Sequence, residues 1–241
     1  MNTIKTLATV AILLLFGSLI LNGCASSDAP PDTTTVTITA ETEGSMATGA
    51  FRKNTNTPTA GIVCDSIEIT RTRFLLSRVK LHVEGNDTLK DGDIKVGPFV
   101  LEFTPGLSRT FSTITIPSGT YEKIKFEIHK FPSSIDQIYL NDPIFTDFVT
   151  GQRSTVIIEG RVWSAGSSIP SNFVYKSQIT ANVEAKFPGT ITFDAGSTPT
   201  IAMIFSPMLA FKASNVLDPR DPDNANDIDK YLKTAIKALK K

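Results

Sequence analysis

Histidine and cysteine are scarce in this chain of 241 residues, which contains two of each. His82 and His129 fall on the polar phase of alternating segments, and neither stands at a spacing typical of metal ligands. The sequence also lacks the Gly-x-Ser-x-Gly turn, the Walker phosphate loop, the His-Glu-x-x-His motif and the dinucleotide fingerprint. We therefore expect solvent-facing histidines and no catalysis. A Ser/His/Asp arrangement assembled from distant loops, as in an envelope hydrolase, is the alternative.

An excess of charge of either sign is also missing. Lys and Arg number 24 and Asp and Glu number 24, so the formal net charge is +0. Proteins that bind nucleic acid present basic patches or stripes. The balance therefore argues against a nucleic-acid partner.

The N-terminal segment has the features of an export signal. Lys5 supplies a positive charge, and the apolar run from Leu7 to Leu21 that follows is shorter than the roughly 20 apolar residues of a membrane-spanning helix. Leu21-Asn22-Gly23-Cys24 then resembles the lipobox of bacterial lipoproteins. This resemblance implies cleavage before Cys24, a diacylglycerol thioether on its sulfur and a fatty acid such as palmitate on its amine. A plain signal peptide followed by a chance cysteine, or an uncleaved membrane anchor, are the alternatives.

The lipobox resemblance has consequences for the rest of the chain. An acylated cysteine would hold the protein on a membrane, because each buried methylene contributes about 0.8 kcal/mol. Ala25, rather than Asp, follows the cysteine, which by resemblance favours the outer membrane. Residues 24–35 contain nothing that packs and would form a tether. Cys64 would be the only remaining thiol, with core burial expected and intermolecular pairing as the alternative.

Apolar residues alternate with polar ones through most of residues 36–211. A period of two is typical of strands with one buried face, and turn signals such as Pro117-Ser118-Gly119 separate the segments. Phe74-Leu75-Leu76 breaks the alternation and predicts a bulge or corner, whereas residues 42–61 are polar and predict a loop. The whole predicts an antiparallel β-sandwich of roughly nine strands. The segments are marked by Val36 to Ala40, Ile67 to Ile69, Val79 to Val83, Phe99 to Phe103, Phe111 to Ile116, Ile124 to Ile128, Val156 to Val162, Phe173 to Phe187, Ile191 to Phe193, and Ile201 to Phe205.

A second resemblance covers residues 36–131. The run Phe99 to Phe103, the stretch Ile116 to Ile124 with its Pro-x-Gly-x-Tyr hairpin, and Val79 to His82 resemble an uncharacterised all-β domain of bacterial lipoproteins. Similar Gly-x-Tyr turns occur in transthyretin-like and immunoglobulin-like sandwiches. The family has no assigned activity, so the resemblance implies a fold and nothing catalytic.

Residues 212–241 change character. Ile228, Leu232 and Leu239, with Tyr231, Ala235 and Ile236, recur at three and four residues, which predicts an amphipathic helix with Asn226 as its N-cap. We expect the helix to dock on the sandwich or to cover an open sheet edge. Contact of its lysines with anionic headgroups or with an amphipathic partner is the alternative.

Acidic residues gather just before and at the start of this predicted helix. Asp218, Asp221, Asp223, Asn224 and Asp227 could supply several of the oxygen ligands that Ca²⁺ prefers. The spacing does not match an EF-hand loop, and helix capping and turn formation explain the same residues without a metal. A calcium site is thus one hypothesis for this segment, and no other cofactor is expected.

Trp163 is the only tryptophan, and its phase places it beside Glu159 and Arg161 on the polar side of a strand. An indole next to charged groups can stack on a sugar ring, or it can fold over the sandwich edge. The sequence therefore predicts a lipid-anchored envelope protein that acts by binding an envelope protein or as a structural module. A glycan-binding lipoprotein that uses Trp163, Arg161 and Glu159 is the alternative.

Overall fold

The computed structural model describes residues 33–43, 64–83, 94–104, 109–164, 166–211 and 216–241. Cys24 and most of the predicted 42–61 loop lie outside these residues. Everything described belongs to one compact unit, Asp32–Lys241. In chain order its elements are β1 (Thr33–Thr42), β2 (Cys64–Leu76), β3 (Arg78–Val83), β4 (Ile94–Val96), β5 (Phe99–Phe103), β6 (Arg109–Pro117), β7 (Gly119–Ile128), η1 (Ser133–Ile135), α2 (Asp136–Tyr139), α3 (Thr146–Val149), β8 (Val156–Ser164), β9 (Ser171–Ser177), β10 (Ala181–Phe193), β11 (Thr200–Phe205), α4 (Pro207–Phe211), η2 (Pro222–Asn224), α5 (Ala225–Leu232) and β12 (Ile236–Lys240).

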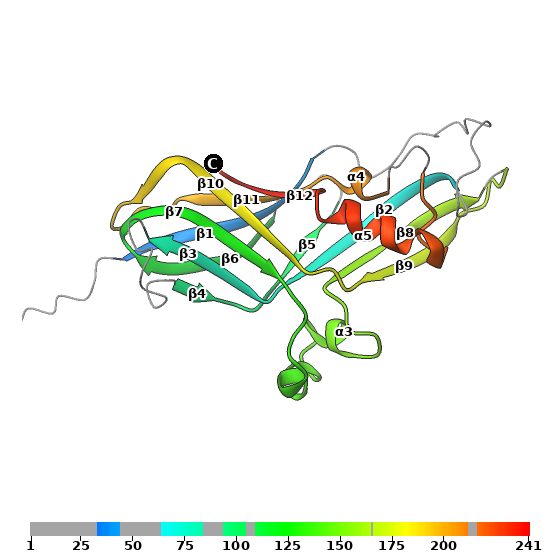
Figure 1. Cartoon of the computed structure of the whole chain (residues 1–241), viewed down its shortest axis with the longest axis horizontal. Coiled ribbons are helices and arrows are strands. Elements are labelled where there is room, and N and C mark those ends of the chain that lie inside the picture. Colours follow the sequence, from blue (N-terminus) through cyan, green and yellow to red (C-terminus); the bar gives the residue numbers. More distant parts are fainter. Residues whose placement is uncertain (1–32, 44–63, 84–93, 105–108, 165, 212–215) are drawn as a thin grey trace, which may run out of the picture. The chain divides into compact units, whose positions relative to one another are not determined.

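The strands form three four-stranded sheets (Figure 1). The first sheet has the order β12-β11-β1-β6, the second β10-β7-β3-β4 and the third β5-β2-β8-β9. Among the described strands, β1 and β11 pair in parallel and the other pairs are antiparallel. The mainly β, antiparallel sandwich predicted from the sequence is confirmed, apart from this one parallel pair. A period of two reports which face of a strand is buried and carries no information on strand direction.

Alternating side chains supply the main core. On β1, Val36 and Ile38 are fully buried, whereas Thr35 and Thr37 are half-buried on the opposite face. The largest contribution comes from aromatic rings: Phe74, Phe103 and Phe205 form a triangle with centroids 5.1–5.6 Å apart. These three rings come from β2, β5 and β11, so they tie the third sheet to the first.

The chain passes from the third sheet to the second at Ser77. The Ser77 N–H and its hydroxyl both donate to the carbonyl oxygen of Glu127, at 2.9 and 3.1 Å. The corner predicted near Phe74-Leu75-Leu76 is therefore present, one residue later. The alternation fails there for a different reason than a bulge: all three side chains are fully buried because β2 is covered on both faces.

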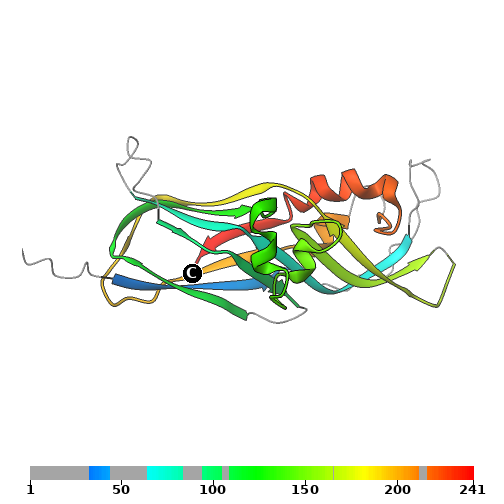
Figure 2. The same ribbon diagram turned by 90° about the horizontal axis from the view of Figure 1, so that it is seen from below.

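Two segments cover the third sheet. On one face, Phe211 of α4 packs against Phe173 and Tyr175 of β9, with centroids 6.3 and 6.4 Å apart. On the other face lies the segment between β7 and β8, residues 129–155, which we call the excursion. It leaves the sheets in Figure 1 and lies in front of them in Figure 2. It closes a second, smaller core made of Leu75, Phe131, Phe145, Phe148, Val149 and Ile157.

The predicted C-terminal helix is half right. The helix α5 begins at Ala225, with Asn224 rather than Asn226 at its N-cap, and ends at Leu232. The next residues form β12, in which buried Ile236 and Ala238 alternate with exposed Lys237 and Leu239. Five residues of β12 pair with the edge of β11, so their backbone groups form hydrogen bonds there. The stabilisation from this pairing exceeds that of a further helical turn. The predicted covering of a sheet edge is thus made by a strand.

Candidate functional site

The third sheet has one face that carries mostly polar side chains. We call it the outer face, because α4 and α5 cover the opposite side. Side chains on this face form rows across the strands, since β8 pairs with β9 and, with two shifts of register, with β2. They are Glu68, Arg71, Arg73 and Leu75 of β2, Val100 and Glu102 of β5, Ile157, Glu159, Arg161 and Trp163 of β8, and Asn172, Val174 and Lys176 of β9.

The excursion covers only one end of the outer face. There Leu75 and Ile157 pack under Phe145, Phe148 and Val149. Beyond Arg73 the described side chains of this face are more exposed: Val174 is 63% exposed and the Arg161 side chain 47%. A single exposed apolar side chain is ordinary on a protein surface, so the open part of this face is a candidate because of the charged network beside Val174.

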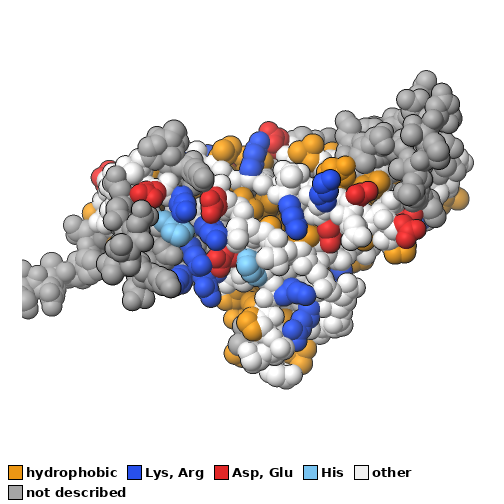
Figure 3. Space-filling view, viewed as in Figure 1, with side chains coloured by type: hydrophobic (Ala, Val, Ile, Leu, Met, Phe, Trp, Pro, Cys, Tyr) orange, Lys and Arg blue, Asp and Glu red, His pale blue; other side chains and the backbone are white. Residues whose placement is uncertain are grey.

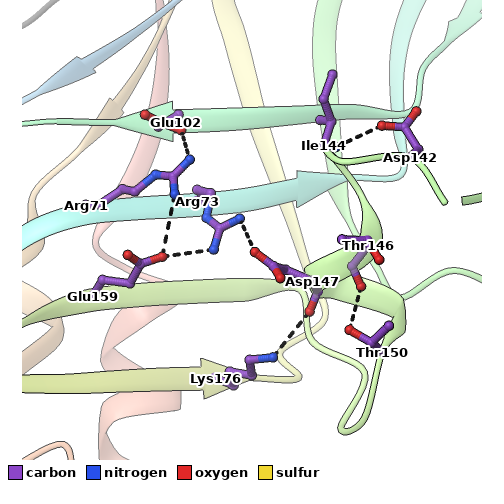
Figure 4. Close-up of polar contacts among 10 residues, drawn as sticks. All are labelled: Arg71, Arg73, Glu102, Asp142, Ile144, Thr146, Asp147, Thr150, Glu159 and Lys176. Carbon is purple, nitrogen blue, oxygen red and sulfur yellow. Dashed lines mark hydrogen bonds and ion pairs between the residues drawn. The ribbon is translucent and has the colours of Figure 1, made fainter. Parts of the chain in front are cut away.

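Arg73 joins the excursion to the sheet (Figure 4). Its side chain is only 8% exposed, and its two terminal nitrogens donate to Asp147 Oδ2 of α3 at 2.7 Å and Glu159 Oε1 of β8 at 2.9 Å. The guanidinium carbon also lies 5.7 Å from the centre of the Phe148 ring. A buried charge needs such partners, so the carboxylates fix the position of α3 on the sheet.

Arg71 extends the same network toward the open part of the face. It pairs with Glu102 of β5 and lies 3.8 Å from Glu159. The hydrogen bond from Arg71 to Glu102 raises the pKa of the arginine, more than burial lowers it. Lys176 reaches the Asp147 carbonyl oxygen at 3.4 Å. The network thus presents fixed guanidinium and carboxylate edges, which suit a polar ligand with several hydroxyl or charged groups.

The three residues predicted to bind a glycan do share this face. Glu159 belongs to the arginine network, and Arg161 pairs with Glu68 at 2.6 Å. Trp163 is half-buried and lies opposite Ser66. The strand phase therefore placed all three correctly, although ion pairs occupy both charged members.

The residues predicted to bind calcium are not brought together. Asp218 is 2% exposed and accepts hydrogen bonds from Arg220, at 3.0 Å from Nε and 2.6 Å from Nη2. Asp221 caps the η2 turn through the Asp223 N–H at 3.0 Å. Asn224 is buried and donates to the Asp218 carbonyl oxygen, whereas Asp223 and Asp227 are exposed. In the described ranges there is no group of three or more His, Cys, Asp or Glu residues that could hold a metal ion.

Cys64 and the two histidines, which carry the remaining reactive side chains considered from the sequence, are buried or half-buried. Cys64 is 5% exposed, which confirms its predicted burial in a strand. Burial, and then the charge of Asp218, raises the pKa of its thiol to about 12. His82 and His129 are half-buried rather than exposed, and His129 Nε2 lies 3.2 Å from Asn182 Oδ1.

The sequence reasoning missed the excursion and the apolar residues at its end. Ile138 is 68% exposed, Leu140 37% and Ile144 57%. We call these three residues the apolar tip. The space-filling view shows hydrophobic side chains on the lobe that projects downward from the sheets (Figure 3). The available signal was an apolar stretch without a period of two between Phe131 and Phe148, which carries more large side chains than one small core can bury.

The chain matches no protein-family model, no curated protein and no solved structure. In the part of the chain that the structure describes, every helix is too short or too polar to cross a membrane. Function is therefore inferred from the sequence pattern and from the geometry of the outer face and the apolar tip.

Proposed function

We propose that the protein is a lipid-anchored component of the bacterial cell envelope that acts by binding through the outer face of the third sheet, without catalysis. The Leu21 to Cys24 pattern supports the anchor. The observation that carries the binding role is the outer face itself. The opposite side of the third sheet packs against α4 and α5. Ion pairs of Arg71 and Arg73 fix the charged side chains of the outer face, and Val174 on this face is exposed.

Preorganisation is the physical reason for choosing this face. Side chains that are already fixed by partners lose little conformational entropy when a ligand arrives. Arg71, Glu159 and Glu102 are fixed in this way, whereas Val174 offers exposed apolar area beside them. A partner with complementary hydrogen-bonding groups around a small apolar centre would fit.

A glycan is the second candidate ligand. Trp163 lies on the same face of β8 as Glu159 and Arg161. An indole ring can stack on the apolar face of a sugar while neighbouring charges bond its hydroxyl groups. The candidate predicts that purified protein binds peptidoglycan or cell-surface polysaccharide. Trp163→Ala should abolish this binding and Trp163→Phe should retain part of it. Equal binding by all three proteins would exclude the stacking role.

The anchor is tested by changing one cysteine and using the other as a control. Cys24→Ser should abolish both the incorporation of a palmitate analogue and the cleavage of the signal segment from the mature protein. Cys64→Ser should leave both unchanged. Lipid incorporation and the mass of the mature N-terminus are the measurements. If Cys24→Ser protein still incorporates lipid and is processed at the same position, the anchor proposal is wrong.

The binding face is tested in cells with a photo-crosslinking amino acid. At Val174 on the outer face it should give a discrete adduct, identified by mass spectrometry. At Thr113, which is exposed on the first sheet, the same group should give none. Adducts of equal yield at both positions, or at Thr113 alone, would refute the assignment of the outer face.

A further inference from the structure

The apolar tip is a second exposed feature that the proposed binding face does not use. Ile138, Leu140 and Ile144 come from α2 and from the turn that leads to α3, and they point away from the small core beneath them. Under that turn, Tyr139 stacks on Phe131 at 4.4 Å and Phe145 contacts both rings, at 4.9 and 5.7 Å. The aromatic rings therefore hold the tip from below while its three aliphatic side chains stay exposed.

Several backbone groups of the turn at the tip are bonded within the protein. The Ile144 N–H donates to Asp142 Oδ1 at 2.8 Å, and the Thr146 N–H donates to the Asp142 carbonyl oxygen at 2.8 Å. The Thr146 hydroxyl donates to the Leu140 carbonyl oxygen at 2.7 Å. A segment can enter an apolar medium only when its backbone groups are bonded within the protein. The bonds around Asp142 and Leu140 meet this condition for part of the turn between α2 and α3.

Basic residues stand at the root of the excursion. Lys130 opens it and is exposed, and Arg153 closes it and is half-buried. Figure 3 shows Lys and Arg side chains on the lower lobe, beside its hydrophobic side chains. The excursion also has three acidic residues: Asp142 accepts a hydrogen bond in the turn, Asp147 pairs with Arg73, and Asp136 begins α2. Basic residues at the root of an apolar end are the groups that would meet anionic headgroups if that end entered a bilayer interface.

The size of the tip decides between a membrane and a protein as its occupant. A stable protein interface uses about 20–30 residues on each side, and the tip has three. Insertion into a bilayer needs no shape-matched partner, because each exposed apolar side chain gains by leaving water on its own. If Cys24 is lipidated, the nine residues from Cys24 to Asp32 reach at most ~30 Å at about 3.1 Å each, which keeps the domain near the bilayer.

We propose that the apolar tip inserts into the headgroup region of the anionic phospholipid bilayer to which the chain is anchored. Ile138, Leu140 and Ile144 enter the apolar boundary, and Lys130 and Arg153 lie at the level of the phosphates. This inference rests on the proposed lipid anchor. It adds a second point of attachment, which orients the domain on the membrane and fixes the direction in which the outer face is presented.

The test uses the full lipidated protein reconstituted in vesicles. Ile144→Cys introduces an accessible thiol, because Cys64 is buried and Cys24 carries lipid. A polarity-sensitive fluorophore is attached there. Val174→Cys, a similarly exposed apolar position, is the matched control. The vesicles contain phosphatidylglycerol and a lipid-borne quencher, and flotation measures anchoring separately.

The expected result is a blue shift and loss of most of the fluorescence at Ile144, with neither change at Val174. Replacing phosphatidylglycerol by phosphatidylcholine, or introducing Lys130→Gln with Arg153→Gln, should reduce the quenching at Ile144. If the protein floats but neither probe is quenched, or both are quenched equally, the tip proposal is wrong while the anchor stands. If the protein does not float, the anchor and the tip proposal fail together. A discrete protein adduct from a photo-crosslinker at Ile144 in cells would also overturn the tip proposal.

Discussion

Asp147→Asn should loosen the excursion without unfolding the sandwich. The substitution keeps the size of the side chain and removes the charge that faces Arg73 at 2.7 Å. Arg73 is 8% exposed and would keep only Glu159, at 2.9 Å, as a charged partner. A hydrogen bond between charged groups contributes about 1.5–3 kcal/mol. Because the Asp147 side chain is 49% exposed and solvent screens it, we expect a loss near the lower end, about 1–1.5 kcal/mol.

The loss should fall on the local opening of the excursion, because its small core is separate from the main one. A change of 1.4 kcal/mol corresponds to about tenfold in an equilibrium constant. Amide hydrogen exchange at residues 145–150 should therefore accelerate about tenfold, and exchange in β8 should stay unchanged. Asp223→Asn, at an exposed carboxylate in the η2 turn, is the matched control and should change neither.

A double-mutant cycle separates the ion pair from other effects of the substitution. In an Arg73→Leu background no buried charge remains, so adding Asp147→Asn should cost nearly nothing. The reasoning would be refuted by unchanged exchange in the single variant. It would equally be refuted if Asp147→Asn cost the same with and without Arg73.

Three further outcomes follow from packing and from ionisation. Gly160→Ala should destabilise the fold by about 3 kcal/mol in urea unfolding, at the upper end for overpacking, because a methyl group there would lie 2.2 Å from a backbone oxygen of β2 and 2.8 Å from the Phe173 ring. Cys64, buried and with its pKa raised to about 12, should react with a thiol reagent at pH 8 only as fast as the protein unfolds, and fast labelling of the native protein would contradict its burial. Burial opposes the ionisation of Glu127, but its hydrogen bond with Lys80 and that lysine's charge lower its pKa overall. This carboxylate thus contributes stability above the unfolded pKa of about 4.3 that is lost as the pH falls through the lower folded value, and Glu127→Gln should flatten the loss of stability below about pH 4 in thermal melts.

The residues of the outer face could be predicted from the sequence where apolar and polar residues alternate with a period of two. On β8 the period of two placed Glu159, Arg161 and Trp163 together, because a strand with one buried face leaves no other option. The pattern said nothing of β2, where Leu75 is buried on the side that also carries Arg73. That side is covered by the excursion, which is separated from β2 by many residues in the chain. Burial by a distant segment leaves no local signal.

The predicted calcium site shows the opposite difficulty. Asp218, Asp221 and Asp223 are close in sequence, and this proximity suggested that they could bind the same calcium ion. In the fold these carboxylates bind different groups. Asp218 forms an ion pair with Arg220, and Asp221 accepts a hydrogen bond from the backbone of the η2 turn. A nearby arginine and free backbone N–H groups compete for the same oxygens as a cation. The sequence contained both competitors but not their geometry.

The C-terminal residues allow a decisive comparison between strand and helix. In β12, Ala238 is 7% exposed and faces the main core, whereas Leu239 is 48% exposed. In the helix predicted from the sequence, Leu239 lies on the apolar face and Ala238 does not. Ala238→Asp would place a charge in the core without a partner, so it should cost several kcal/mol, among the largest effects of single substitutions. Leu239→Asp should stay within about 0.5 kcal/mol. The two variants differ by one position, carry the same new charge and are compared by urea unfolding. A larger loss for Leu239→Asp would show that the last residues form a helix, and that the edge of β11 is covered in another way.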